Sequence, residues 1–225
     1  MLQKPTITPR KKPIQARSQA TVDAILEATA RVLVDDGYDR ASTNRIAERA
    51  GVSIGSLYQY FPSKESLVGA LIDRHADEML AVFLRQVAAV RDAPVPAAVR
   101  AVVSATVDAH LVEPKLHRIF EEQVPRIGKL AESLERLDTH ASEAVRAYLL
   151  AHRDEVRVAD LETAIFVVVH AVEALVHRAV SVKRGPSRDA LVEAIVDMVT
   201  RFLTDTSAPV QGTSRRRGER QQPPR

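Results

Sequence analysis

Histidine is the residue type in this chain best suited to holding a metal ion or exchanging protons, and the sequence contains seven of them. His170, Glu173 and His177 are spaced to share one face of a helix, while His110 and His117 are seven residues apart. On one continuous helix, seven residues make two turns, or about 10 Å, so two such imidazoles cannot both reach a zinc ion at about 2 Å. The spacing therefore predicts no metal site. It favours polar groups that line a ligand cavity or an interface.

The familiar motifs of catalysis are absent from the sequence. It has no His-Glu-x-x-His zinc motif, no glycine-rich phosphate loop and no Gly-x-Ser-x-Gly nucleophile turn. It also has no cysteine, which leaves neither disulfides nor thiolate ligands and fits a reducing cytoplasm. We therefore expect a protein that is not an enzyme and that needs no cofactor.

A second set of useful side chains lies in residues 42–71, which read STNRIAERAGVSIGSLYQYFPSKESLVGAL. Ser42 or Thr43 can cap a first short helix, which Gly51 then ends because glycine adopts the left-handed conformation without strain. Ser53 can cap a second helix, and Pro62 stops it. Two short helices joined by a turn that contains glycine form the helix-turn-helix motif, which sets its second helix in the DNA major groove.

The residues that this motif would turn outward are suited to DNA. No carboxylate lies between the turn glycine and the next lysine. Tyr58, Tyr60 and Lys64 offer hydroxyl groups and a cation to the phosphate backbone, while Ser56 and Gln59 could reach base edges. Each of these side chains could equally pack or stay solvated, so the spacing alone leaves an ordinary helical hairpin open.

The stretch resembles the DNA-binding signature of the tetracycline-repressor (TetR) family of bacterial transcription regulators, in the segments TNRIAERAGVS, GSLYQYF and SKESL. The likeness extends upstream through ILEATARVLVDDGYDRAS, which is similar to the first helix of that family. The resemblance implies phosphate contacts from Thr43, Ser53, Tyr58 and Lys64, and contacts to bases or the groove wall from Asn44, Ile54, Gly55, Ser56, Gln59 and Tyr60.

The net charge of +3 is unevenly distributed along the 225 residues. Residues 1–22 hold lysines and arginines but no acid, and the C-terminal tail is rich in arginine. The N-terminal arm adjoins the first expected helix and is the better candidate for a phosphate contact, whereas the C-terminal segment could simply be solvated. No secretory signal and no run of about 20 uninterrupted apolar residues is present, so we expect a cytoplasmic protein that does not enter a membrane.

Helical periodicity dominates the chain, and no strand pattern competes with it. A long helix from Lys64 to about residue 90 would connect the DNA-binding unit to a second group of helices. We expect an all-α protein of about nine helices, divided into a basic arm (1–14), a helix-turn-helix domain (15–62), a ligand-binding and dimerisation domain (63–203, with 63–90 as the linking helix) and a basic tail (204–225).

The helix expected over residues 160–183 is apolar almost all the way round, so it must be covered on two sides. One side can face its own domain and the other a second copy of the chain. The last helix also carries a broad apolar face, and the family resemblance implies a four-helix interface in a homodimer that binds a palindromic operator. The expected interface residues are Val168, Val172, Leu175, Leu191, Ile195, Met198 and Phe202.

The second domain is larger than dimerisation requires, which favours a site for a small apolar effector. Histidines on otherwise apolar faces suit a cavity with a few orienting polar groups, although a filled core would explain Met79, Phe83 and Phe166 equally well. The candidate lining residues are His75, Met79, Phe83, Val103, Val107, His110, Phe120, Phe166 and His170.

Two other functions remain open at this point. The chain could be a DNA-binding regulator without small-molecule control, or a helical enzyme or scaffold that merely contains a helical hairpin. Neither the operator sequence, the effector, the regulated genes nor the choice between repression and activation can be derived from the residues.

Overall fold

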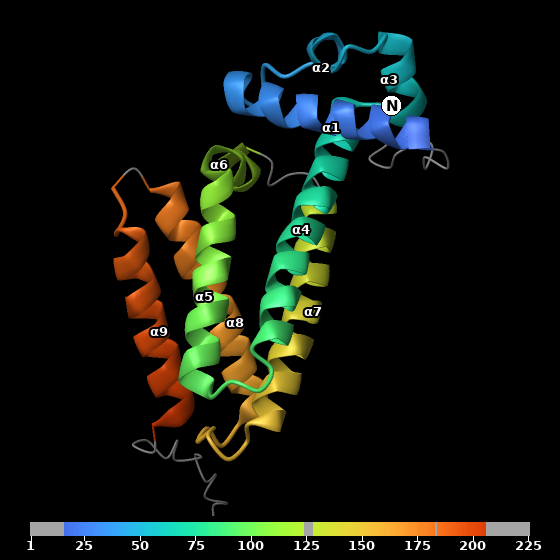
Figure 1. The fold of residues 1–225 in the computed structure, drawn as a ribbon. Coiled ribbons are helices and arrows are strands. Elements are labelled where there is room, and N and C mark those ends of the chain that lie inside the picture. Colours follow the sequence, from blue (N-terminus) through green and yellow to red (C-terminus); the bar gives the residue numbers. More distant parts are fainter. Residues whose placement is uncertain (1–15, 124–127, 183, 206–225) are drawn as a thin grey trace, which may run out of the picture.

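The computed structural model describes residues 16–123, 128–182 and 184–205. Within these ranges the chain forms nine α-helices and no strand, which confirms the all-α prediction (Figure 1). The expected basic arm of residues 1–14 and nearly all of the basic tail lie outside the described residues. The helices are α1 (Ala16–Asp36), α2 (Thr43–Ala50), α3 (Ile54–Tyr60), α4 (Lys64–Ala89), α5 (Val95–Val112), α6 (Pro114–Gln123), α7 (Gly128–Ala151), α8 (Leu161–Ser181) and α9 (Arg188–Thr204).

Side-chain caps set the ends of the short helices. The hydroxyl groups of Ser42, Ser53 and Ser63 each accept a hydrogen bond from a backbone N–H three residues further on. Gly51 ends α2 in the left-handed conformation, with φ of 67°. The turn between α2 and α3 is therefore fixed by residues that the sequence already identified.

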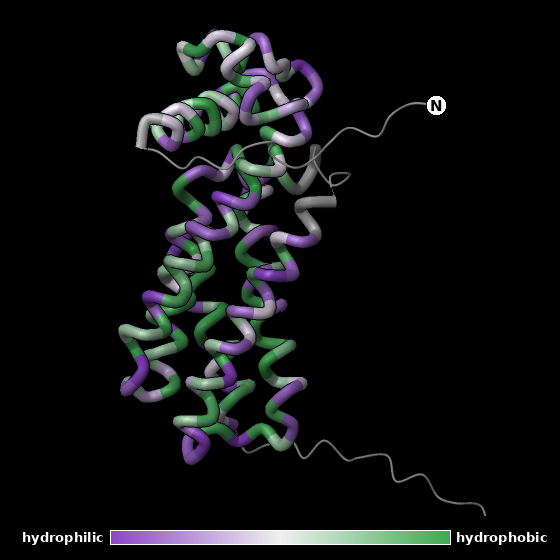
Figure 2. Tube along the Cα trace, turned by 90° about the vertical axis from the view of Figure 1, so that its right-hand side faces the viewer, coloured by the Kyte–Doolittle hydropathy of each residue, from purple (hydrophilic) through white to green (hydrophobic). Residues whose placement is uncertain are grey.

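The molecule has a small head, formed by α1 to α3, on top of a longer helical bundle (Figure 1). α4 runs from the head down through the bundle, where it packs against α5 and α7. Hydrophobic residues run along the bundle helices in Figure 2, and hydrophilic residues gather at several of the turns at its foot. A single straight helix thus joins the two parts, as the sequence predicted.

Two hydrophobic cores hold the fold together. The upper core contains Ile25 and Leu33 of α1 and Leu57 of α3, all fully buried, together with Leu67 of α4. It also takes in three side chains of α6, namely Leu116, Ile119 and Phe120. The head is therefore braced by α6 as well as by α4, so its core does not end at residue 62. The lower core joins α5, α8 and α9 through residues such as Val107, Val176 and Ile195.

Two helices, α5 and α8, are long and apolar enough to cross a membrane by length and composition alone. Both helices pack within the bundle, where α5 contacts α4, α8 and α9. A core helix can have the same length and apolar composition as a membrane-spanning one. Only 17% of the most apolar window of α8 is buried, however. This helix leaves an apolar face uncovered within the single chain.

Candidate DNA-binding surface and effector cavity

α3 is oriented by two buried side chains, Leu57 within the helix and Phe61 directly after it, which anchor it in the upper core. The opposite side of the helix is open, with Tyr58 42% and Ile54 38% exposed. The residues expected at DNA divide by exposure: Asn44, Ser53, Ile54, Gly55, Tyr58 and Gln59 are exposed, whereas Thr43, Ser56, Tyr60 and Lys64 are half-buried.

Hydrogen bonds among the hydroxyl groups order this surface. Thr43 Oγ1 lies 3.1 Å from the Tyr58 hydroxyl and so connects the start of α2 to α3. Ser53 Oγ accepts from the Ser56 N–H at 3.1 Å and lies 2.9 Å from Ser56 Oγ. Four hydroxyl groups thus stand near the N-terminal ends of two helices, where the helix dipoles favour an anion such as phosphate.

Lys64 has a structural role that the sequence did not reveal. Its Nζ donates to the Tyr38 carbonyl oxygen at 2.9 Å and lies 4.2 Å from the centroid of the Tyr38 ring. The side chain therefore ties the start of α4 to the turn after α1. An ammonium group has three donors, so a phosphate contact would use one that Tyr38 does not occupy.

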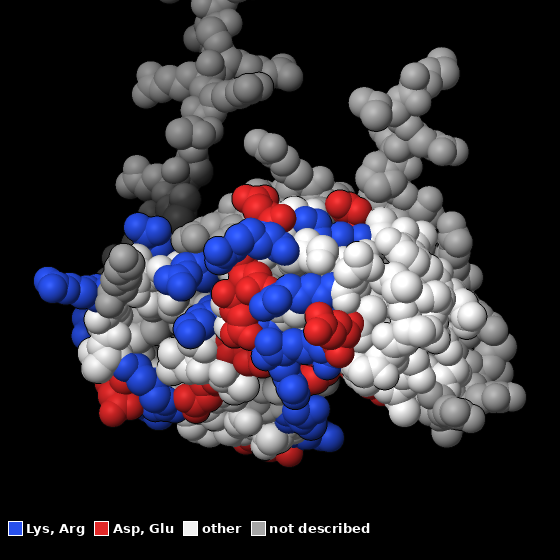
Figure 3. Space-filling model, turned by 90° about the horizontal axis from the view of Figure 1, so that it is seen from above, with Lys and Arg blue, Asp and Glu red and all other residues white. Residues whose placement is uncertain are grey.

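The described part of the head offers DNA little net positive charge. Arg45 pairs with Asp36, and Arg49 pairs with Asp35 at 2.9 Å, so both arginines of α2 are tied to the end of α1. α3 contains no charged residue. Figure 3 shows, from above, an area free of charged groups beside an area where both signs mix. Long-range attraction to DNA would depend on the basic N-terminal residues, which lie outside the described structure.

Among the described residues, nothing crowds the position that a side chain at Gly55 would take. A Cβ atom there would meet only Ser53 Oγ, at 3.9 Å. By contrast, Gly51 needs its left-handed φ of 67°. Because glycine costs up to about 1 kcal/mol in a helix relative to alanine, Gly55 is best explained by close approach to a partner surface.

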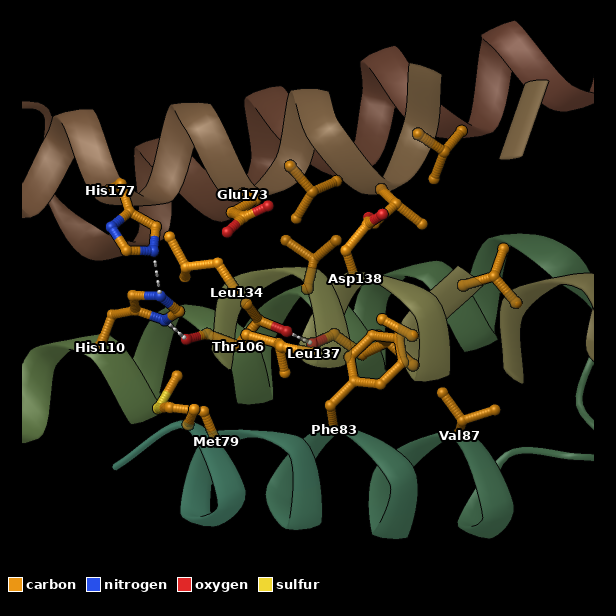
Figure 4. Close-up of a pocket in the computed structure, with 18 of the residues that line it drawn as sticks. Met79, Phe83, Val87, Thr106, His110, Leu134, Leu137, Asp138, Glu173 and His177 are labelled. Carbon is orange, nitrogen blue, oxygen red and sulfur yellow. Dashed lines mark hydrogen bonds between the residues drawn. The ribbon is translucent and has the colours of Figure 1, made fainter. Parts of the chain in front are cut away.

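Below the head, a cavity of about 390 Å³ lies between the bundle helices (Figure 4). Met79 and Phe83 face it from α4, Leu137 from α7, and Glu173 from α8. Its lining is mainly aliphatic, and its volume falls within the range of small-molecule sites. A polar exception is Asp138, whose Oδ1 is buried without a hydrogen bond.

Most of the predicted lining residues meet at this cavity, but three do not. Val107 is buried in the lower core. Phe166 is 61% exposed and stacks on His170, whose Nε2 lies 3.5 Å from Asp138 Oδ1. Because α8 is apolar all round, its periodicity did not reveal which face turns inward. His75, Met79, Phe83, Val103, His110 and Phe120 do line the cavity.

The inward face of α8 is instead formed by residues that we had expected at the dimer interface. Val168 and Val172 line the cavity. Ile195, also expected at the interface, is 1% exposed and belongs to the lower core of its own chain. Leu191 packs against that core, whereas Leu175, Met198 and Phe202 are each about two-fifths exposed.

At one end of the cavity the structure gathers four histidines from four helices. The Nε2 atoms of His75 and His117 lie 3.1 Å apart, as do those of His110 and His177. The rings of His110 and His117 stack with centroids 4.7 Å apart. The sequence analysis applied to these two residues the spacing rule of one continuous helix, which does not hold here because they lie on different helices. The chain turns between α5 and α6, and Pro114, the first residue of α6, is the feature of the sequence that marks this break.

Two of these imidazoles, those of His75 and His117, are held in their neutral form. Burial lowers the pKa of His75 to about 4, and the neighbouring His177 and Arg74 contribute to the shift. Burial, followed by the charges of the other three histidines, lowers the pKa of His117 to about 2. His110 Nδ1 lies 2.8 Å from the Thr106 carbonyl oxygen. Because a carbonyl oxygen only accepts, Nδ1 carries the proton and Nε2 of a neutral His110 presents a lone pair.

Comparison with known proteins identifies the family. The family model "Bacterial regulatory proteins, tetR family" matches residues 25–71, and the model "Tetracyclin repressor-like, C-terminal domain" matches residues 94–203. The chain belongs to the TetR family of transcriptional regulators. The first match covers the helix-turn-helix, and the second covers the helices from α5 to α9.

Several relatives share part of the sequence. The nucleoid occlusion factor SlmA of Actinobacillus pleuropneumoniae is 39% identical over 70 residues, which are 31% of this chain and 33% of that protein. SlmA of Glaesserella parasuis is 29% identical over 140 residues, or 58% of this chain and 67% of that protein. The chain thus matches only about a third of the length of the first of these relatives.

Solved structures share the fold over most of the chain. A TetR-family regulator from Mesorhizobium loti has a TM-score of 0.68 and 20% identity, covering 84% of this chain and 97% of that one. The regulator FadR of Bacillus subtilis, in complex with stearoyl-CoA, has a TM-score of 0.66 and 16% identity, covering 80% and 98%. At these identities the likeness establishes the fold.

We predict opposite effects from substitutions at the two glycines of the helix-turn-helix. Gly55→Ala should leave thermal stability unchanged or raise it by up to about 1 kcal/mol, because the methyl group meets open space. It should weaken operator binding by about 10-fold or more, equal to about 1.4 kcal/mol, because the methyl group would separate α3 from the groove wall.

Gly51→Ala is the matched control. It should lose about 1–2 kcal/mol of folding stability, because an L-residue is strained at φ of 67°. Chemical denaturation and operator titration measure both quantities. Unchanged operator affinity in a stable Gly55→Ala protein would contradict the proposed close approach.

Proposed function

We propose that the protein is a homodimeric repressor that leaves a palindromic operator when a small apolar molecule enters the cavity of the bundle. The observation that carries this proposal is the position of α4. Its first half supplies Leu67 and Leu71 to the core of the head, and its second half supplies Met79 and Phe83 to the cavity wall. A ligand that displaces the lower half of the helix would therefore move the head.

The chemistry of the cavity supports an apolar ligand with a small polar part. Valine, leucine and phenylalanine side chains form most of the wall, whereas Glu173 and Asp138 stand apart as acids. Bacillus subtilis FadR, a structural relative, was solved with stearoyl-CoA. For this chain the corresponding proposal is limited to a compound with a hydrocarbon portion that fits about 390 Å³.

The alternative is a DNA-binding regulator without small-molecule control. An unfilled apolar cavity lowers stability, because its lining atoms lose packing contacts. We therefore favour the ligand-responsive function, which gives the cavity a use.

The proposed dimer interface follows from the exposed face of α8 and α9. Phe166, Val167 and Leu175 project from α8, and Met198 and Phe202 project from α9, with exposures between 39% and 61%. The two helices contact each other within the chain. Two copies of this face could pack as four helices, which would bury the apolar groups and hold two heads at a fixed spacing.

We predict that Phe202→Glu converts the dimer to a monomer. The carboxylate would be buried against apolar groups of the partner copy, and operator affinity should fall by about 100-fold or more, because two joined heads bind with avidity. Sedimentation at micromolar concentration and operator titration measure the two effects.

Arg201→Glu is the matched control, since it adds a carboxylate to the neighbouring residue, whose guanidinium makes only an exposed ion pair with Asp197. It should remain dimeric. If the wild-type protein sedimented as a monomer while binding its operator, the proposed interface would be wrong.

We predict that an effector found by titrating operator-bound protein with apolar compounds will raise thermal stability and lower operator affinity by about 100-fold, or about 2.7 kcal/mol. Val172→Phe is the matched variant, because Val172 lines the cavity and a phenyl ring would occupy part of it. This variant should bind the operator normally and respond weakly. A compound that stabilised the wild-type protein without changing operator affinity would rule out the coupling.

A further inference from the structure

We propose that His75, His110, His117 and His177 form a binding site for a divalent transition-metal ion, with zinc as the best match. The site lies where α4, α5, α6 and α8 meet, at one end of the cavity (Figure 4). The four histidines also line that cavity, but the binding of a metal ion by them does not depend on the proposed DNA function.

The spacing of the nitrogen atoms matches a tetrahedral site. Zinc binds imidazole nitrogen at about 2.0–2.1 Å, so neighbouring ligand atoms of a tetrahedron lie about 3.3 Å apart. The His110 and His177 Nε2 atoms are 3.1 Å apart, and so are those of His75 and His117. Ligand atoms of His110, His117 and His177 all lie within 4.8 Å of one another. Small rotations of the rings would bring one ion within reach of all of them.

The surroundings prepare the imidazoles for a metal. Metal-bound histidine commonly donates its second N–H to a carbonyl oxygen, which fixes the ring and its tautomer. His110 makes this contact to Thr106, so its Nε2 lone pair points toward His177. Glu173, one helical turn before His177, adds a carboxylate to the same cavity.

The same four side chains could instead form two hydrogen-bonded imidazole pairs with only a structural role. In each pair one Nε2 would donate to the other. Such hydrogen bonds account for the 3.1 Å distance within each pair, but they do not require the His75–His117 pair to lie against the His110–His177 pair. The stacking of His110 on His117 brings the two pairs together, and it leaves ligand atoms of His110, His117 and His177 within 4.8 Å of one another, as a site for one ion requires.

Occupancy of the site would fix α6 relative to α4, α5 and α8. His117 follows Leu116, which is buried in the core of the head, and Ile119 and Phe120 of the same helix also enter that core. A bound ion would therefore hold α6, one of the two supports of the head, to the bundle. The expectation that this changes operator affinity rests on the proposed function, whereas metal binding itself does not.

The test uses the full-length protein after treatment with a chelator. Zinc should raise the melting temperature, and cobalt(II) should give the intense visible absorption bands of tetrahedral coordination. His117→Gln and His177→Gln should each weaken zinc binding by at least about 100-fold. Loss of a group that only hydrogen-bonds to a metal ligand already lowers metal affinity by up to about 100-fold, and loss of the ligand itself should lower it at least as much. Both variants should melt as one cooperative transition without metal, which shows that they fold.

His140→Gln is the matched control, because His140 is exposed on α7, away from the cluster. It should bind zinc and cobalt as the wild-type protein does. Absence of tetrahedral cobalt bands in the wild-type protein, or equal zinc stabilisation in wild type and in folded His117→Gln, would overturn the proposal and leave hydrogen-bonded imidazole pairs. Operator titration is measured separately, so a failed metal site and a failed regulatory function can be told apart.

Discussion

The structure depends on one helix that contributes to two different interiors. α4 places Leu67 and Leu71 in the tightly packed core of the head and Met79 and Phe83 at an unfilled cavity. Its backbone hydrogen bonds run without a break over 26 residues, so the helix moves largely as a rod. The upper end is held by close packing in the core of the head, while the lower end forms part of the cavity wall. A ligand in the cavity would therefore act on the lower end of the helix.

α6 gives the head a second support that also reaches the cavity. Its buried residues Leu116, Ile119 and Phe120 belong to the upper core, while His117 faces the other histidines. Because α1 contacts both α4 and α6, the head rests on two helices whose separation is set by the side chains between them. His75 and His117 form that link, with their Nε2 atoms 3.1 Å apart. A change in the distance between His75 and His117 would therefore alter the separation of α4 and α6, the two helices on which the head rests.

Local signals in the sequence were sufficient for the helices and for the helix-turn-helix. The caps Ser42, Ser53 and Ser63, and the left-handed Gly51, act within a few residues and need no tertiary information. The exposed positions Ile54, Gly55 and Gln59 on α3 followed from the same spacing, whereas Ser56 and Tyr60, also expected outside, are half-buried. Whether these residues touch phosphates or bases stays a prediction, since exposure shows only that they are accessible.

The sequence failed where the answer depended on long-range packing. For α8, an apolar circumference gave no indication that Val172 would face the cavity and Phe166 the solvent. For the histidines, the helical spacing rule was applied across the break between α5 and α6, where it does not hold. His110 and His117 come together because the chain changes direction at Pro114, and His75 and His177 join them from helices far away in the sequence.

The two apolar faces of α8 explain why one helix should couple a ligand to a partner chain. Val168 and Val172 line the cavity, whereas Val167 and Leu175 are exposed on the outside. Both faces belong to one helix, whose backbone hydrogen bonds hold neighbouring turns together, so a displacement of the helix at the cavity would also move its exposed face. If the exposed face packs against a second copy, filling the cavity would press on that interface as well as on α4. The contents of the cavity would then affect both the position of each head, through α4, and the angle between the two heads, through the dimer interface.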